Sequence, residues 1–246
     1  MLVINPYIFK RFPEIIFGFS TKIGMNRKEP YFFNMSYSVG DEKEIINENR
    51  RAFSKSIGID YNSIAYQKQV HSDIAAIVEK SGVCRESDAI ITKKKNLGLT
   101  ISTADCCGIF IYDPVQSLIA AVHSGWRGTE KTILKKVLEK LSADFESKSN
   151  DLICYLAPSI SQQNYEVGKD VAELFEAKYL KSINNKFFLN IPEINKDILL
   201  NFGVRKNNIQ VSRLCSYEYS SILHSYRRDG KYSGRAWGII AMKGNE

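Results

Sequence analysis

The chain has 246 residues, of which 44% are hydrophobic, 11% aromatic and 25% charged. This composition is typical of a globular protein with a full core, and it excludes a disordered, fibrous or disulfide-stapled chain. With 34 basic and 27 acidic residues the formal net charge is +7, which permits an anionic partner without choosing among nucleic acid, phosphate and nucleotide-like molecules.

Apolar runs of strand length alternate irregularly with helix-like stretches, and no linker, repeat or low-complexity tract divides the chain. The predicted strands lie at residues 15–20, 73–78, 88–92, 98–103, 108–112, 118–123, 152–158, 208–212 and 236–242. The predicted helices lie at residues 42–58, 129–145, 168–180 and 190–204. The pattern predicts the α+β (mixed α/β) class, with residues 1–246 forming a single domain.

The predicted helix at 129–145 has an apolar face and follows a glycine-rich loop. Thr129 is its expected N-cap, and the apolar face consists of Ile133, Leu134, Val137, Leu138 and Leu141. The preceding loop, Gly125-Trp126-Arg127-Gly128, offers backbone N–H groups and an arginine, which together favour a phosphate. The alternative is that the glycines only make a tight turn and that Trp126 fills the core.

The strands predicted at 108–112 and 118–123 flank Asp113-Pro114-Val115-Gln116, a sequence typical of a β-hairpin turn. If Pro114 and Val115 are the two turn residues, Cys106 and His123 lie directly opposite each other on one face. Their Cβ atoms would then be roughly 4.5–5.5 Å apart. This spacing suits two ligands of one metal ion or a Cys–His catalytic pair.

The chain contains only three histidines: His71, His123 and His224. His71 precedes the strand at 73–78, at a strand edge where sites are commonly built. The count also limits the redox chemistry, because a trinuclear copper cluster requires about eight imidazoles. A multicopper mechanism is therefore excluded for a single chain.

The cysteine count and the N-terminal sequence bear on the compartment. Five cysteines are an odd number and too few for a disulfide scaffold, so reduced thiols in a cytosol are expected. The N-terminus lacks the pattern of a signal peptide. The longest apolar stretch, residues 107–122, is interrupted and falls short of the roughly 20 residues that span a bilayer. A cytoplasmic protein with no membrane partner is expected.

The densest basic run is Lys93-Lys94-Lys95, between a predicted strand and a turn. Lysines in such a place are usually solvated. No helix-turn-helix, RNA-recognition or zinc-finger pattern accompanies the run. No nucleic-acid partner is therefore expected.

Several motifs in order resemble a known family. They include QVHSD at 69–73, TADC at 103–106 and HSGWRGT at 123–129, with further matches at 18–24, 87–92, 157–168 and 225–230. This set, spread over nearly the whole chain, resembles the YfiH family of laccase-domain proteins, once called polyphenol oxidases. The resemblance implies a single domain of mixed β-sheets layered with helices.

The resemblance also implies a zinc site made by His71, Cys106 and His123, the motif residues of QVHSD, TADC and HSGWRGT. Cys106 is preferred to Cys107 because neighbours on a strand point to opposite faces. Three such ligands leave a fourth position for water or substrate, as in catalytic zinc sites.

The resemblance further makes three arginines the expected substrate- and phosphate-binding residues: Arg50 of ENR, Arg127 of HSGWRGT and Arg228 of SYRRDG. The adjacent Asp229-Gly230 is typical of a hairpin turn. His224 lies where relatives tend to carry an aromatic residue, so we expect it to be non-catalytic.

The activity that the resemblance implies is purine nucleoside chemistry. A zinc-dependent phosphorylase would convert adenosine, inosine or S-methyl-5′-thioadenosine with phosphate to the free base and ribose 1-phosphate, with adenosine deaminase activity besides. Two alternatives use the same residues. A cysteine hydrolase would use Cys106 as nucleophile and His123 as base on cell-wall precursor peptides. A single copper ion in the His–Cys–His site would oxidise phenols weakly.

Overall fold

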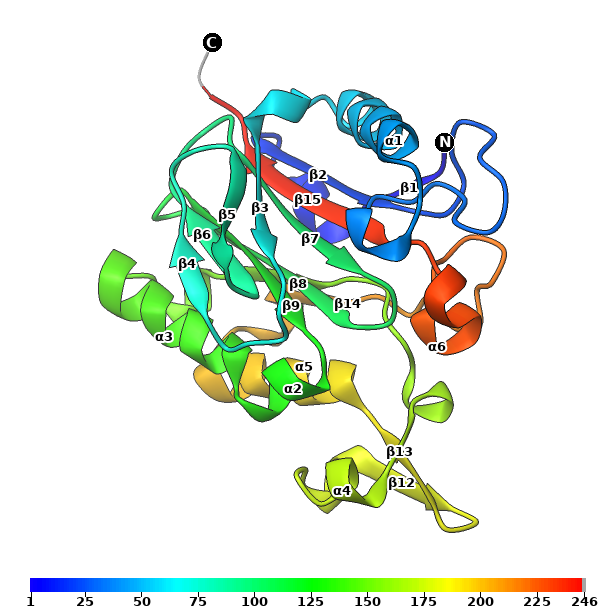
Figure 1. Cartoon of the computed structure of the whole chain (residues 1–246). Helices are drawn as coiled ribbons and strands as arrows, with labels where there is room; N and C mark the ends of the chain where they lie inside the picture. The colour runs from blue at the N-terminus through cyan, green and yellow to red at the C-terminus, as the bar shows by residue number, and fades with distance from the viewer. Residues whose placement is uncertain (245–246) are drawn as a thin grey trace.

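The computed structural model describes residues 1–244 and contains two six-stranded sheets and one three-stranded sheet (Figure 1). The first six-stranded sheet has the order β1(Val3–Ile4), β2(Ile15–Ser20), β15(Ala236–Met242), β7(Gly98–Thr103), β3(Ile64–Lys68) and β5(Gly82–Glu86). Within it, β3 is parallel to both of its neighbours and the other pairs are antiparallel.

The second six-stranded sheet is built around the predicted hairpin. Its order is β14(Ile209–Val211), β10(Ile153–Leu156), β8(Cys107–Asp113), β9(Leu118–Ser124), β6(Ala89–Thr92) and β4(Ala75–Ile77). The two outermost pairs are parallel and the central ones antiparallel. Since both faces of this sheet are covered, β8 and β9 are buried along their whole length.

The two large sheets pack face to face and helices cover their outer faces (Figure 1). Phe17, Ile101 and Phe110 contribute to the core between the sheets. On the outer face of the first sheet lies α1(Lys43–Ser56), whose buried Phe53 packs beside Trp237. On the outer face of the second sheet lie α3(Ile133–Phe145) and α5(Ile191–Phe202). The predicted mixed α/β single domain is confirmed.

The small sheet lies beyond α5 at the lower end of the molecule in Figure 1. Its order is β11(Glu166–Val167), β13(Lys186–Leu189) and β12(Leu180–Ile183). The helix predicted at 168–180 is wrong for most of its length, because only α4(Lys169–Ala172) is α-helical there. The following residues turn into the β12–β13 hairpin, whose cross-strand pairing outweighs the helical periodicity of the segment.

Two local expectations are also corrected. Thr129 does not cap α3, because it lies in a separate short helix, α2(Trp126–Glu130), and its hydroxyl donates to the carbonyl of Gly125. Asp229-Gly230 does not make a hairpin turn, because it is the C-terminal end of α6(Tyr226–Asp229). This helix is capped by Ser225, whose hydroxyl accepts a hydrogen bond from the Arg228 backbone N–H. In both places a side chain bonds to nearby backbone and stabilises a short helix.

Three of the predicted helices and all the predicted strands have counterparts in the structure. The predicted apolar face of α3 is fully buried, and Lys93, Lys94 and Lys95 are exposed. Among residues 1–244, no helix has both the length and the apolar character needed to cross a membrane.

Replacing Leu138 with alanine is expected to lower the free energy of unfolding by about 2–5 kcal/mol, since its side chain is fully buried in α3 and would leave a cavity. Lys135→Ala on the exposed face of the same helix is the control, expected to change stability by less than about 0.5 kcal/mol because surface ion pairs contribute little. Urea unfolding measures both. If both substitutions lowered the free energy of unfolding equally, the result would contradict the assignment of Leu138 to the buried face of α3.

Candidate metal centre

Three side chains from separate segments converge at one end of the two large sheets. His71 lies in the loop after β3, Cys106 directly precedes β8, and His123 lies in β9. One potential ligand atom from each lies within 4.8 Å of the others. The two imidazole rings are 5.0 Å apart between centroids, at an interplanar angle of 76°. The structure thus brings together the three residues predicted as metal ligands.

The hairpin that positions Cys106 and His123 has a different register from the predicted one. His123 pairs with Gly108 rather than Cys106, and Asp113 pairs with Leu118, which leaves residues 114–117 as the loop. The loop is longer because the Asp113 carboxylate accepts hydrogen bonds from the backbone N–H groups of Val115 and Gln116. The shift of two residues preserves the face on which each side chain lies, so Cys106 and His123 still converge.

The backbone near the ligands includes left-handed conformations. His71 has φ 58° and Asp105, directly before Cys106, has φ 92°. The Asp105 turn is held by its carboxylate, which accepts hydrogen bonds from the Ser216 hydroxyl at 2.5 Å and the Arg227 backbone N–H at 2.6 Å. A non-glycine residue in such a conformation costs about 1–3 kcal/mol. These contacts offset the strain and fix the position of Cys106 directly before β8.

The electrostatics favour a thiolate at Cys106. Burial alone would raise the pKa of this thiol, but the charge of His123 and hydrogen bonds from His123 and His71 lower it to about 6. Burial opposes charge on His123 as well, yet Cys106 and Asp88 raise the His123 pKa to about 9. At the neighbouring Cys107, burial raises the pKa to about 12. Because the thiolate is the form that binds metals, this contrast favours Cys106 over Cys107 as a candidate ligand.

The His123 ring is oriented by Asp88, a residue that the sequence analysis did not single out. The carboxylate lies 2.8 Å from Nδ1 of His123, which leaves Nε2 for the other members of the group. Asp88 is fully buried, and its pKa is lowered to about 2: burial opposes this, but hydrogen bonds from His123 and Ser72 prevail. The signal in the sequence is an acidic residue immediately before a buried strand, β6.

The space around the group fits a metal ion. A Cβ atom at Gly125 would lie 2.9 Å from Sγ of Cys106 and 3.2 Å from Cδ2 of His71. The φ of Gly125 is −79°, which any residue adopts, so the requirement for glycine is steric. Two imidazoles and a thiolate are the ligands that zinc prefers, and cuprous copper also accepts them. The residues present therefore fit either ion.

Gly125→Ala is expected to displace Cys106 or His71 and to weaken zinc binding by at least about tenfold, since overpacking costs about 1–3 kcal/mol. Competition with a chromophoric chelator measures the affinity, and thermal unfolding of the metal-free protein shows whether the fold is retained. A folded variant with unchanged affinity would contradict the assigned geometry.

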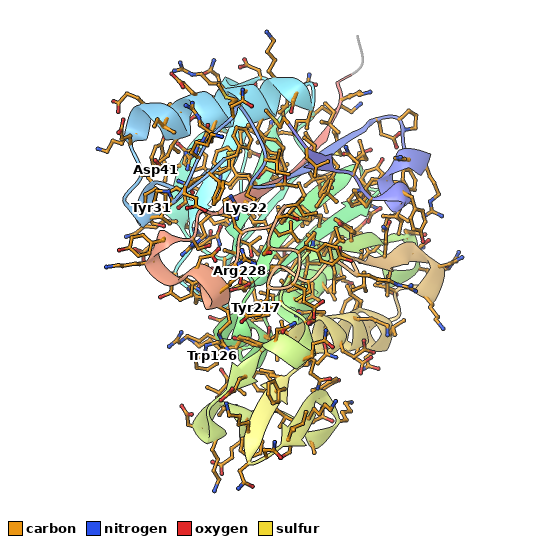
Figure 2. The ribbon with its side chains drawn as sticks, turned by 90° about the vertical axis from the view of Figure 1, so that its right-hand side faces the viewer. Lys22, Tyr31, Asp41, Trp126, Tyr217 and Arg228 are labelled. Atoms are coloured by element: carbon orange, nitrogen blue, oxygen red, sulfur yellow. The ribbon has the colours of Figure 1, made fainter. Side chains whose placement is uncertain are left out.

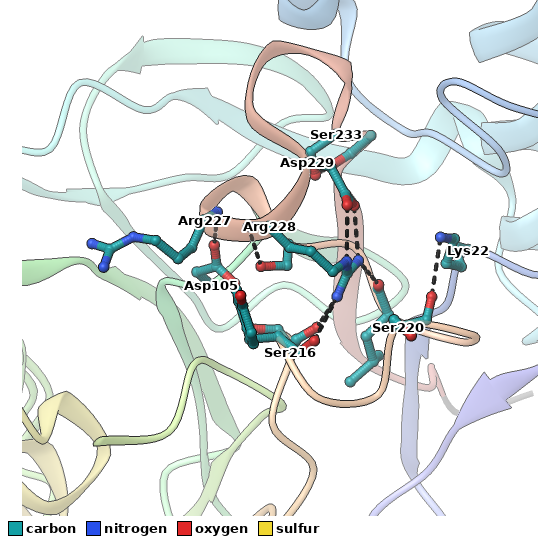
Figure 3. A network of polar contacts seen from close by, with 12 residues as sticks. Lys22, Asp105, Ser216, Ser220, Arg227, Arg228, Asp229 and Ser233 are labelled. Carbon is teal, nitrogen blue, oxygen red and sulfur yellow. Dashed lines mark hydrogen bonds and ion pairs between the residues drawn. The ribbon is translucent and has the colours of Figure 1, made fainter. Parts of the chain in front are cut away.

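Arg228, one of the three arginines predicted to bind phosphate, is fully engaged within the protein (Figure 3). Its Nη1 donates to the carbonyls of Ser216 and Tyr217, and its Nη2 to the carbonyl of Leu223. Its Nε and Nη2 also donate to the Asp229 carboxylate at 2.8 Å. These contacts match the five N–H groups of a guanidinium, so none remains for phosphate.

Figure 2 shows Arg228 and Trp126 between the small sheet at the bottom of the view and α1 at the top.

The adjacent Arg227 extends in the opposite direction from Arg228 (Figure 3). Its guanidinium lies 5.1 Å from the centre of the Tyr165 ring and donates one hydrogen bond, to the carbonyl of Glu166. Burial raises the pKa of Tyr165. The charged side chains of Cys106, Asp105, Arg127 and Arg227 also act on that pKa. Arg227 is exposed and its guanidinium has donors to spare, while its backbone N–H binds Asp105, the residue directly before Cys106.

Arg127 and Arg50, the other two predicted arginines, have contrasting environments. Arg127 is exposed and stacks 4.3 Å from the ring centre of Trp126, which is half-buried. Since α2 spans only five residues, the expected anion site there depends on the arginine side chain rather than on a helix dipole. Arg50 is buried between the rings of Tyr37 and Trp237, at 3.9 and 4.2 Å.

Among the residues that the structure describes, the Arg50 side chain makes one hydrogen bond, from Nε to the Met35 carbonyl at 2.7 Å. Its Nη1 is buried without a hydrogen-bond partner among residues 1–244. A buried cation without a counter-ion is costly, so this group is suited to an anionic ligand. His224, expected to be non-catalytic, lies outside the metal-binding group and is buried beside the Phe33 carbonyl, where burial lowers its pKa to about 3.

The fold and the converging side chains define a mixed α/β protein with a His–Cys–His group that could hold a metal ion. The chain belongs to the family described as multi-copper polyphenol oxidoreductase laccase, which matches residues 16–243. It is 32% identical over 247 residues to a purine nucleoside phosphorylase of Clostridium acetobutylicum, covering 98% of each chain. It is 29% identical over 248 residues to the purine nucleoside phosphorylase YlmD of Bacillus subtilis, covering 94% of this chain and 89% of the relative.

Solved structures agree with this placement. The hypothetical protein YfiH of Bacillus licheniformis superposes with a TM-score of 0.90 at 26% identity, covering 96% of this chain and 94% of that one. The family description does not suit the histidine content of this chain, since three histidines cannot supply a trinuclear copper cluster. The two relatives are instead named purine nucleoside phosphorylases.

Proposed function

We propose that this protein is a zinc-dependent purine nucleoside phosphorylase that acts on adenosine, inosine and S-methyl-5′-thioadenosine and also deaminates adenosine. The convergence of His71, Cys106 and His123 within 4.8 Å carries the proposal. Relatives that align over nearly the whole chain and are named purine nucleoside phosphorylases support the substrate class. Purine nucleosides and phosphate are thus its proposed partners, and the cytoplasm its proposed location.

His71, Cys106 and His123 would hold the zinc ion, which would act as a Lewis acid and make water more acidic. The remaining chemistry depends on the protein's own cations and aromatic rings. We propose that Arg50 and Arg127 bind phosphate, and that Arg227 takes the role expected of Arg228, whose donors are engaged. The rings of Trp126 and Tyr165 offer apolar faces for a purine base.

In phosphorolysis a phosphate oxygen forms a bond to C1′ of the ribose while the bond from C1′ to N9 of the base breaks. The base leaves with the electron pair and takes up a proton, which gives free base and ribose 1-phosphate. Arginines that hold the phosphate against C1′ would contribute through orientation and charge stabilisation. In deamination the oxygen of water adds at C6 and ammonia leaves.

The test is base release from inosine and adenosine by zinc-loaded protein, with and without phosphate. The proposal predicts that free base and ribose 1-phosphate form in equal amounts and only with phosphate present. Ribose in place of ribose 1-phosphate would indicate a hydrolase and contradict the proposal. Inosine formed from adenosine without phosphate would report the deaminase activity separately.

Arg227→Ala is expected to raise the KM for phosphate by about 10- to 100-fold, because a hydrogen bond to a charged group contributes about 1.5–3 kcal/mol. The KM for inosine should change much less. Arg205→Ala is the matched control, since Arg205 is also exposed and follows α5 on the outer side of the second sheet. Equal effects of the two substitutions on phosphate would contradict the role of Arg227.

A further inference from the structure

We infer that Asp88 is a positioning residue that assembles the metal centre by orienting His123 and fixing the loop that carries His71. This inference rests on the proposed zinc site. Asp88 is fully buried immediately before β6, between β9 on one side and the loop after β3 on the other. Each of its two carboxylate oxygens serves one of these two segments.

The first oxygen, Oδ1, lies 2.8 Å from Nδ1 of His123. The backbone reinforces this contact, because the N–H of His123 donates to the carbonyl of Asp88 at 2.7 Å. A carboxylate at Nδ1 engages that nitrogen and leaves Nε2 as the one that faces the other two candidate ligands. The ring is therefore fixed in direction.

The second oxygen, Oδ2, binds the two residues on either side of His71. It accepts hydrogen bonds from the Ser72 backbone N–H at 2.5 Å, the Ser72 hydroxyl at 2.8 Å and the Val70 backbone N–H at 3.2 Å. His71 itself has a left-handed φ of 58°. Because the loop offers these donors to a single oxygen, Asp88 stabilises the strained turn that aims His71 at Cys106 and His123.

An asparagine cannot replace Asp88 in this arrangement. A carboxylate accepts hydrogen bonds at both oxygens, whereas an amide has one acceptor oxygen and one donor nitrogen. In Asp88→Asn the NH₂ group would face either the Nδ1 proton of His123 or the N–H groups around His71. One of the two ligands would therefore lose its support although the substitution preserves the side-chain shape.

The test compares zinc affinities, measured by competition with a chromophoric chelator, in wild type, Asp88→Asn and Asp113→Asn. Loss of an outer carboxylate typically weakens metal binding about 10- to 100-fold, which is the loss expected for Asp88→Asn. Asp113 is the matched control, since it is equally buried and also accepts loop N–H groups, but at the far end of the β8–β9 hairpin. Asp113→Asn should lower stability and leave the zinc affinity within about twofold of wild type.

If Asp88→Asn fails to fold, Ser72→Ala provides the second variant, because it removes one hydroxyl donor to Oδ2 and retains both backbone donors. Its expected loss of zinc affinity is about 3- to 10-fold. Unchanged affinity in a folded Asp88→Asn, or in Ser72→Ala, would overturn the role of Asp88 while leaving the zinc site intact. A wild-type protein that binds no zinc would instead contradict the proposed function.

Discussion

Cys106→Ala is expected to lose zinc and to lower the rate of base release by at least about 10³-fold, because an ion at this site is proposed to supply several kcal/mol of transition-state stabilisation. The adjacent Cys107→Ala is a closely matched control. Cys107 points away from the group into the buried cluster beneath α3, and burial raises its pKa to about 12. Its replacement should lower stability modestly and leave both zinc content and activity near wild type.

The paired cysteine variants also test the register of the β8–β9 hairpin. Successive residues of a strand lie on opposite faces, so only one of the two thiols can face His123. Zinc loss in Cys107→Ala together with retention in Cys106→Ala would mean that the strand face is reversed. That outcome would contradict the site geometry, because Gly125 is fitted against Cys106 and not against Cys107.

Removal of the metal is expected to abolish base release while leaving the protein folded. The buried clusters between and outside the two large sheets do not depend on the three ligands, so circular dichroism should show little change. Re-addition of about one zinc per chain should restore the activity, whereas copper should not restore it to the same level. Activity that persists at full strength after complete chelation would contradict a metal-dependent mechanism.

Alkylation distinguishes the metal site from the cysteine-hydrolase alternative. A zinc-bound thiolate is shielded, so iodoacetamide should modify Cys106 only after chelation. A nucleophilic Cys106 that uses His123 as its base would react readily in the protein as purified and would remain active without metal. Mass spectrometry of the modified peptide, with Cys107 in the same peptide as an internal reference, separates the two mechanisms.

The strands and three of the helices follow from apolar periodicity, but pairing details do not. The predicted β8–β9 hairpin correctly placed Cys106 and His123 on one face. Its register was wrong by two residues, because the Asp113 side chain organises a longer loop. The segment at 168–180 has helical periodicity, yet its end pairs with β13. Such pairing depends on residues distant in sequence, which local patterns do not report.

The candidate site, like the fold, was predicted only in part from the sequence. The hairpin pattern suggested either two metal ligands or a catalytic pair at Cys106 and His123, and the motif resemblance added His71 and the choice of a metal site. Asp88 was missed because its role is visible only when β6, β9 and the loop after β3 are assembled. Likewise, sequence cannot distinguish Arg227 from Arg228, since the loop carbonyls that engage Arg228 are positioned by the fold.

The measurement that tests the central claim most directly is phosphate-dependent base release from inosine by protein of known zinc content, in wild type and His71→Ala. We expect about one zinc per wild-type chain, equal yields of base and ribose 1-phosphate, and loss of both zinc and activity in the variant. A wild-type protein that holds one zinc per chain but releases no base would contradict the phosphorylase assignment. Full activity in a zinc-free His71→Ala protein would contradict the metal centre itself.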